Sequence, residues 1–396
     1  MQEIKIGPNQ AGQRLDKFLH KYLPNAGSSF LYKMLRKKNI TLNGKKAEGR
    51  EILSVGDVVQ SFFAEETFLK FSVRAAQVVQ STHAKQATHQ KEDKKKGDTE
   101  KVAAERASIE GGATERPAIE RADVSKTDTY REAFQKLKGI SVLYEDAEKL
   151  LLNKPVGILT QKAKDTDLSL NEWLIGYLLQ SGVIEQKELA TFKPSVCNRL
   201  DRNTSGIVIC SKTLAGSQRL SEMIRTREIR KFYRTICVGE VAQRVILEGY
   251  LHKDNIANKV TVTEAACMLT GERTGNHNAV MEREPVSAMK GIHAKAPKLS
   301  PIKTICAPLC TNGEYTLLEV ELITGKTHQI RAHLASIGHP LVGDHKYGSS
   351  ETNQRKRIMQ YQLLHAYRVV FPDGLEVTAP YPEQFQRWLA RLLPEM

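Results

Sequence analysis

The sequence of 396 residues predicts an α+β protein with two folded units joined by a flexible linker. Short β-branched runs alternate with stretches of helical periodicity, which is the pattern of an α+β fold. From Ser81 to Thr129 there is no Leu, Phe, Trp, Tyr or Met, so this segment cannot bury enough apolar surface to offset its ordering entropy. The length also suffices for two or three domains. We therefore expect units at 1–72 and 131–396, with the linker at 73–130.

The first unit begins with two stretches of helical spacing. Their apolar residues are Leu15, Phe18, Leu19 and Leu23 in the first, and Phe30, Leu31, Met34 and Leu35 in the second. The second stretch also carries a basic set, Lys33, Arg36, Lys37 and Lys38, on its other side. Ile40–Leu42, an Asn43–Gly44 turn and Val55–Val59 follow, which predicts a small strand-turn-strand unit after the helices.

The second unit mixes both kinds of element. Strands are expected around 140–144, 150–153, 207–211, 232–238 and 315–322, and helices around 168–179 and 214–224. Between about 265 and 299 the sequence is polar and irregular, which predicts a long surface loop or insertion.

The segment Arg199–Gly206 places one acidic side chain, Asp201, between Arg199 and Arg202 on a turn that ends in glycine. An aspartate held by cations stays ionised and can act as a nucleophile or base. Taken alone, a solvated surface ion pair explains these residues equally well. The apolar run 207–210 that follows predicts a buried strand directly after the turn.

A second segment, Glu321–Leu334, predicts a helix that Thr327 caps and Gly338 ends. Its apolar face consists of Ile330, Leu334 and Ile337, and Arg331 lies near the helix start beside that face. The segment Gly338–Gly348 follows.

The chain resembles the RluA family of RNA pseudouridine synthases in five segments that occur in the family's order. These are Asn153–Gly157, Asn198–Gly206, Lys231–Tyr233, Gly325–Leu334 and Gly338–Gly348. The chain has Asn198 where many members have histidine. The resemblance covers about Tyr130 to the C-terminus, and it implies a mixed, largely antiparallel sheet with a central cleft.

The resemblance also implies roles for individual residues. Asp201 would be the catalytic carboxylate, Arg331 its salt-bridge partner, and Tyr233 the ring that packs against the target uracil. Three steps are open to such an aspartate: attack on the sugar, attack on the base, or removal of a ribose proton. Arg199 resembles the arginine that fills the place of the displaced base, and it serves equally well as a second ion partner of Asp201. Without the neighbouring segments, Tyr233 would be read as a core aromatic and Arg331 as a helix-surface cation.

The first unit resembles the S-four-type (alpha-L) RNA-binding module over about 12–63. In that case the basic side chains contact phosphates and position the catalytic unit, and such binding weakens steeply with salt. The residues concerned are Arg14, Lys33, Arg36, Lys37 and Lys38. The alternative is a solvated basic helix in an unrelated small domain.

The formal net charge of +14 favours a polyanionic partner. The six cysteines form no CxxC pair, which favours reduced thiols in a cytoplasmic protein, and no apolar stretch predicts a membrane span. The spacing of His328, His333, His339 and His345 does not match a metal motif such as HExxH, so packing or hydrogen bonding is favoured over metal binding. No metal and no nucleotide cofactor are expected, because the reaction oxidises nothing and a phosphate-binding glycine run is absent.

We expect a monomeric, cytoplasmic isomerase that acts on structured RNA, and the resemblance implies ribosomal RNA of the large subunit. The alternative is a noncatalytic RNA-binding or ribosome-assembly protein that keeps the fold. A hydrolase with Asp201 as nucleophile ranks last, because no second carboxylate lies at a suitable spacing.

Overall fold

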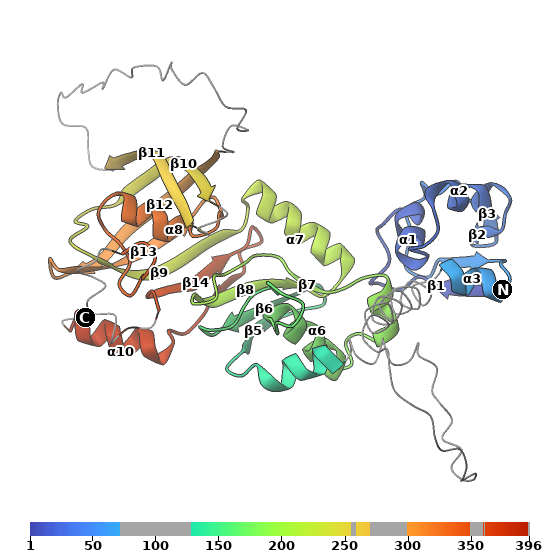
Figure 1. Cartoon of the computed structure of the whole chain (residues 1–396), viewed down its shortest axis with the longest axis horizontal. Helices are drawn as coiled ribbons and strands as arrows, with labels where there is room; N and C mark the ends of the chain where they lie inside the picture. The colour runs from blue at the N-terminus through green and yellow to red at the C-terminus, as the bar shows by residue number, and fades with distance from the viewer. Residues whose placement is uncertain (72–127, 255–258, 270–298, 349–358, 360, 395–396) are drawn as a thin grey trace, which may run out of the picture.

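The computed structural model describes residues 1–71, 128–254, 259–269, 299–348, 359 and 361–394. They form two units with separate hydrophobic cores, and Figure 1 shows the smaller, N-terminal unit at one end of the long axis. Most of the predicted linker lies outside the described residues. In the described ranges no helix has the length and apolarity that crossing a bilayer requires.

The N-terminal unit has a four-stranded sheet in the order β1-β4-β2-β3, with helices packed against it. Its elements are β1 (Gln2–Lys5), α1 (Leu15–Tyr22), α2 (Ser28–Arg36), β2 (Ile40–Leu42), β3 (Lys45–Lys46), β4 (Val58–Ser61) and α3 (Glu65–Phe71). The predicted turn joins β2 to β3, where Asn43 and Gly44 have φ values of 52° and 72°. The apolar residues at helical spacing, among them Phe18 and Leu31, are buried as expected. The resemblance to the S-four-type module stays a prediction.

In the second unit the described residues include one mixed sheet of 11 strands. The strands are β5 (Ser141–Glu145), β6 (Lys149–Lys154), β7 (Ser195–Val196), β8 (Ser205–Ser211), β9 (Arg230–Val238), β10 (Val245–Asp254), β11 (Lys259–Leu269), β12 (Ser300–Thr311), β13 (Tyr315–Leu322), β14 (Leu364–Val370) and β15 (Glu376–Thr378). The path runs β11-β10-β12-β13-β9-β14-β8-β6-β5, with β15 beside β14 and β7 beside β8. Only β14 and β8 pair in parallel among these neighbours. The predicted α+β class and the mixed, largely antiparallel sheet are therefore confirmed, while the central cleft stays a prediction.

Helices cover both faces of this sheet. They are α6 (Leu170–Gln180), the 3-10 helix η1 (Gln186–Ala190), α7 (Leu214–Thr226), α8 (Gln329–Ser336), α10 (Glu383–Leu392) and a helix at 128–136. Alternate residues of a strand point to opposite faces. Leu152 of β6 therefore packs in one core with Leu174 of α6, while Leu151 packs in another with Leu220 of α7.

Two elements extend beyond their predicted bounds. The helix at 128–136 begins within the last residues of the predicted linker, and its backbone crosses α6 at Gly176, where an added Cβ would lie 2.3 Å from the Tyr130 carbonyl oxygen. The loop expected from 265 begins later, since β11 continues to Leu269, which pairs with Val245 of β10. The rest of the predicted insertion, up to 298, lies outside the described residues.

The N-terminal unit contacts the second unit through η1 and the residue that follows it. The amide of Asn9 donates to a Glu188 carboxylate oxygen at 3.2 Å, and the Gln10 amide donates to the Thr191 hydroxyl at 3.0 Å. Asn9, Gln10 and Thr191 are all buried. The two units therefore meet at a polar contact on the side of the second unit that carries α6 and β7, away from β10 and β11 (Figure 1).

Candidate active site

Asp201 lies in the loop between β7 and β8, and glycine is required where this loop enters the sheet. Gly206 has a φ of +109°, and a Cβ at this position would lie 2.2 Å from the Ala366 carbonyl oxygen. This close approach lets β8 pair in parallel with β14. Within the loop, the Thr204 backbone N–H donates to the Asp201 carbonyl oxygen at 3.0 Å, which closes a tight turn around the carboxylate.

The residues on either side of Asp201 are held by the segment that follows β6. The Thr160 hydroxyl donates to the Leu200 carbonyl oxygen at 2.7 Å and accepts the Leu200 backbone N–H at 3.2 Å. The Gly157 N–H donates to the Arg202 carbonyl oxygen at 2.9 Å, and Arg202 Nε donates back to the Gly157 carbonyl at 3.0 Å. Two-sided anchoring of this kind fixes the backbone that carries Asp201.

Lys154, at the end of β6, is a third anchor. Its ammonium group is fully buried and donates to the carbonyl oxygens of Pro155, Ile158 and Arg202 at 2.9, 2.9 and 3.1 Å. Burial lowers the pKa of this lysine to about 7, although the negative charge of Asp201 opposes the shift. Three carbonyl acceptors match the three N–H donors of the charged form.

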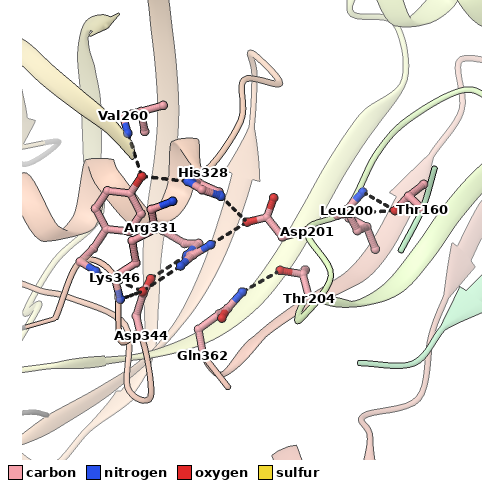
Figure 2. A network of polar contacts seen from close by, with 11 residues as sticks. Thr160, Leu200, Asp201, Thr204, Val260, His328, Arg331, Asp344, Lys346 and Gln362 are labelled. Atoms are coloured by element: carbon pink, nitrogen blue, oxygen red, sulfur yellow. Dashed lines mark hydrogen bonds and ion pairs between the residues drawn. The ribbon is translucent and has the colours of Figure 1, made fainter. Parts of the chain in front are cut away.

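Asp201 is paired with Arg331 of α8, which joins two carboxylates. Arg331 Nη1 donates to Asp201 Oδ2 at 2.9 Å, while Nε and Nη2 donate to the two oxygens of Asp344 at 2.7 and 2.9 Å (Figure 2). The side chain of Asp344 is 0% exposed, that of Arg331 9% and that of Asp201 26%. Of the three groups, the Asp201 carboxylate is thus the one that solvent or a substrate can reach.

The pKa shifts of Asp344 and Arg331 follow from their burial and from the two hydrogen bonds that Arg331 donates to the Asp344 carboxylate. Burial alone would raise the pKa of Asp344, but the hydrogen bonds and charge of Arg331, with the N–H groups of Lys346 and Tyr347, lower it overall. Burial alone would lower the pKa of Arg331, but Asp344 and then Asp201 raise it. Both groups are therefore charged at neutral pH.

The start of α8 differs from the prediction. The N-cap residue is His328, not Thr327, and it adopts the left-handed conformation with a φ of 55° and makes no side-chain cap. Its ring instead points toward Asp201, with Nε2 at 3.7 Å from Oδ2, and toward the Tyr347 hydroxyl, with Nδ1 at 2.8 Å (Figure 2). The expected apolar face is present, with Ile330 and Leu334 buried. A non-glycine residue held in this conformation is a marker of functional sites.

Tyr233 of β9 reaches the same region through the sheet. Across the strands it pairs with Ala366 of β14, which in turn pairs with Gly206 of β8. Burial raises the pKa of Tyr233, and the negative charge of Asp201 raises it further. The side chain is only 6% exposed and packs in the main core. The fold thus pairs Asp201 with Arg331 and places Tyr233 in the same row of the sheet as Gly206, which ends the Asp201 loop.

The two arginines beside Asp201 in sequence do not hold it. Arg202 donates to the Gly157 carbonyl, and Arg199 is exposed and makes no ion pair with Asp201 in the described residues. The expectation that these neighbours clamp the carboxylate, including Arg199 as a second ion partner, is wrong. The cation that holds Asp201 is Arg331 of α8. Folding of the sheet brings this distant residue close to the carboxylate, whereas the local turn does not bring the neighbouring arginines to it.

The predicted RNA-contacting basic residues belong to the N-terminal unit, whereas Asp201 belongs to the second unit. Four are exposed at the end of α2 and in the turn after it, namely Lys33, Arg36, Lys37 and Lys38. Arg14 instead pairs with Asp16 at 2.7 Å, and Asp16 also accepts a hydrogen bond from Tyr32. Arg14 is thus partly engaged within its own unit.

The four histidines have separate partners. Besides His328, His333 meets the Thr304 hydroxyl at 3.0 Å, His339 the Val238 carbonyl at 3.0 Å, and His345 the Met359 carbonyl at 3.0 Å. In the part of the chain that the structure describes, no group of three or more His, Cys, Asp or Glu side chains could hold a metal ion.

Asn198 has a structural contact. Its side-chain oxygen accepts the Ile209 backbone N–H at 2.7 Å, which anchors the start of the Asp201 loop to β8.

Residues 148–336, which contain Asp201, Tyr233 and Arg331, match the family described as RNA pseudouridylate synthase. Residues 148–336 are an RNA pseudouridylate synthase domain. An uncharacterised RNA pseudouridine synthase of Mycoplasma genitalium is 29% identical to this chain over 234 residues, which cover 59% of this chain and 64% of that relative. The chain thus spans a little under two thirds of that relative's length.

Other relatives extend beyond this synthase domain. The ribosomal large subunit pseudouridine synthase C of Vibrio cholerae is 24% identical over 399 residues, 99% of this chain and 97% of that protein. Among solved structures, human RNA Pseudouridylate Synthase Domain Containing 4 has a TM-score of 0.49 at 20% identity and covers 68% of this chain and 97% of its own. The predicted family is confirmed for the domain.

Sequence reasoning missed several residues around Asp201. Asp344, His328, Tyr347, Lys154 and Thr160 all contact either Asp201 or the groups that hold it. Four of them lie within the resemblance segments, so the signal was present in the sequence. Their partners are distant in sequence, as with Asp344 and Arg331, and only the fold reveals the contacts.

Proposed function

We propose that this chain is an RNA pseudouridine synthase that isomerises uridines of large-subunit ribosomal RNA, with Asp201 as the catalytic carboxylate. The observation that carries the proposal is the pairing of Asp201 with a buried arginine inside a synthase domain. The names of relatives, among them the large-subunit enzyme of Vibrio cholerae, support the substrate class. Such an enzyme would meet its substrate in the cytoplasm.

The chemistry requires no change of oxidation state. The bond between N1 of uracil and C1′ of ribose breaks, and a bond between C5 and C1′ forms. C5 loses its proton and N1 gains one, so atoms and electrons balance without a cofactor. An ionised carboxylate can attack as a nucleophile or remove a proton, and the Asp201 carboxylate is held ready for either by Arg331.

Tyr233 supports the base, in our proposal, and does not titrate. Ionising a free phenol at pH 7 costs about 4 kcal/mol, and burial near Asp201 raises the pKa of this one. Because its ring is mostly buried, it would form an apolar wall against one edge or face of the uracil. Arg331 fixes the carboxylate and neutralises part of its charge.

Extruding the uracil from its stack costs a few kcal/mol. Arg199 is exposed and two residues from Asp201, so its guanidinium can enter the position that the base vacates. The exposed basic residues on and after α2, together with Arg14, would contact phosphates and dock the RNA.

The test is to map pseudouridines in ribosomal RNA from cells that lack this protein and that carry either the wild-type chain or the Asp201→Asn variant. We expect one or more pseudouridines to disappear in the deletion, to return with the wild type, and to stay absent with the variant. Full restoration by Asp201→Asn would favour the noncatalytic RNA-binding alternative. An unchanged pseudouridine map in the deletion strain would overturn the proposed substrate.

A further inference from the structure

His328 is held between two oxygen atoms, and each contact faces a different ring nitrogen. Nδ1 is 2.8 Å from the Tyr347 hydroxyl, and Nε2 is 3.7 Å from Asp201 Oδ2 (Figure 2). The side chain of His328 is 11% exposed. The left-handed backbone at this residue directs the ring across the start of α8.

The Tyr347 hydroxyl makes two contacts within the described residues. The Val260 backbone N–H donates to the Tyr347 oxygen at 3.0 Å, so that oxygen already accepts a hydrogen bond. In the described residues His328 Nδ1 is the acceptor within hydrogen-bond distance of the hydroxyl. We infer that Tyr347 donates its hydroxyl proton to Nδ1, which in the neutral ring places the remaining N–H on Nε2, facing Asp201.

The charges around His328 favour this neutral form. Burial lowers the pKa of His328, and the positive charges of Arg331 and Lys346 lower it further. Asp201 and Asp344 act in the opposite direction, but the pKa is lowered overall. Lys259 also lies over the Tyr347 ring at 5.6 Å, with Arg331 at 5.2 Å, so cations surround the pair.

The two contacts of Asp201 fall on the same oxygen. Arg331 Nη1 and His328 Nε2 both face Oδ2. In the part of the chain that is described, no donor reaches Oδ1. A carboxylate held on one oxygen presents the other to a substrate, and apo contacts of this kind commonly shorten in the substrate complex.

We propose that His328, fixed in one tautomer by Tyr347, is a positioning residue that holds Asp201 Oδ2 so that Oδ1 faces the uridine. This inference rests on the proposed function of Asp201. It adds that the Tyr347 hydroxyl affects the reaction through His328 and not through packing. A shift of the reacting oxygen by about 1 Å can cost roughly 100-fold in rate.

The test is a double-mutant cycle measured as single-turnover release of tritium from RNA labelled at uridine C5. We expect His328→Ala and Tyr347→Phe each to lower the rate constant about 10- to 100-fold while RNA affinity changes less than about 3-fold. Tyr347→Phe keeps the ring that packs beside Arg331, so it removes only the hydroxyl. His328→Gln keeps an N–H near the Nε2 position and should retain more of the rate than His328→Ala.

The cycle separates positioning from structural support. If Tyr347 acts through His328, Tyr347→Phe has little further effect in the His328→Ala background. An equal fold-loss in both backgrounds, or a Gln variant as slow as the Ala variant, would overturn the inference. Asp201→Asn is included in the same assay: an active Asp201→Asn enzyme would overturn the proposed function itself, whereas an inactive one leaves the cycle as the test of His328.

Discussion

At the scale of single residues, two carboxylates pair with the guanidinium of Arg331, and the two differ strongly in their exposure to solvent. Asp344 is fully buried and accepts hydrogen bonds from two of the three guanidinium nitrogens of Arg331. Asp201 is partly exposed and accepts a hydrogen bond from the third. A buried carboxylate that is fully hydrogen bonded orients its partner and is unavailable for chemistry. This contrast supports our proposal that Asp201 is the reacting carboxylate, with Asp344 orienting Arg331.

This division predicts the effect of Asp344→Ala on stability. Removing one partner of a buried ion pair typically costs about 3–5 kcal/mol of unfolding free energy at neutral pH, because the remaining charge is left poorly compensated. Urea unfolding at pH 7, followed by the fluorescence of Trp173 and Trp388, measures this loss in the second unit. Asp165→Ala, at an exposed position, is the control and should change the free energy by less than about 0.5 kcal/mol.

The loss of unfolding free energy in Asp344→Ala should depend on pH. The pKa of Asp344 is lowered on folding from its usual 3.8, so its stabilising contribution is complete above about pH 4 and is lost as the pH falls through the lowered value. The difference between wild type and Asp344→Ala should therefore shrink toward pH 3. A difference that stays constant from pH 7 to pH 3 would contradict the buried charged pair.

At the scale of elements, one row of residues across β8, β14 and β9 connects the Asp201 loop to Tyr233. Gly206 pairs with Ala366, and Ala366 pairs with Tyr233. The parallel pairing of β8 with β14 has no space for a side chain at Gly206. The geometry of the site thus depends on a backbone contact in the sheet.

Gly206→Ala should therefore disturb both stability and activity. The positive φ and the clash with the Ala366 carbonyl together should cost about 3 kcal/mol or more of unfolding free energy. Gly374→Ala is the matched control, since its φ is +87° but no atom lies within 4 Å of the added Cβ. We expect the control to lose about 1–2 kcal/mol and to keep its activity. Equal losses in the two variants, measured by urea unfolding, would show that the close approach is unimportant.

The elements that could be predicted from sequence are those whose pattern is local. The helical spacing around Phe18 and the Asn43–Gly44 turn each determine their own structure. β12 was not predicted, because Pro301 and Pro308 disfavour a strand; the structure accommodates Pro308 at a register shift. The cap of α8 was predicted wrongly: the N-cap position is His328, whose ring contacts Tyr347 and Asp201 outside the helix and does not cap it.

At the scale of the whole molecule, the residues that we propose for docking and those that we propose for catalysis lie in different units. The exposed basic residues on and after α2 belong to the N-terminal unit, whereas Asp201 lies in the large sheet. Asp201, Tyr233 and Arg331 could be named from sequence because each lies in a recognisable segment. The cation that holds Asp201 could be named only through the resemblance, since the nearer Arg199 and Arg202 fit the local pattern better.

This separation predicts the salt dependence of RNA binding. If Lys37 and Lys38 each contact a phosphate, the double variant Lys37→Gln, Lys38→Gln should bind RNA more weakly. The negative slope of log affinity against log salt should then become smaller in magnitude by about 1.5. Arg387→Gln with Arg391→Gln removes the same charge from exposed positions on α10 and should change the slope far less. Filter binding at several salt concentrations measures both slopes. Identical slopes for the two variants would argue against docking through the end of α2.

The most direct test of the central claim, that Asp201 isomerises uridine, uses purified protein and ribosomal RNA labelled with tritium at uridine C5. Joining C5 to the ribose releases that label into water, so its release reports the reaction itself. We predict release by the wild type and none by Asp201→Asn, although the variant binds the RNA with nearly unchanged affinity. Release by Asp201→Asn at the wild-type rate, or equal loss of binding and release, would contradict the account.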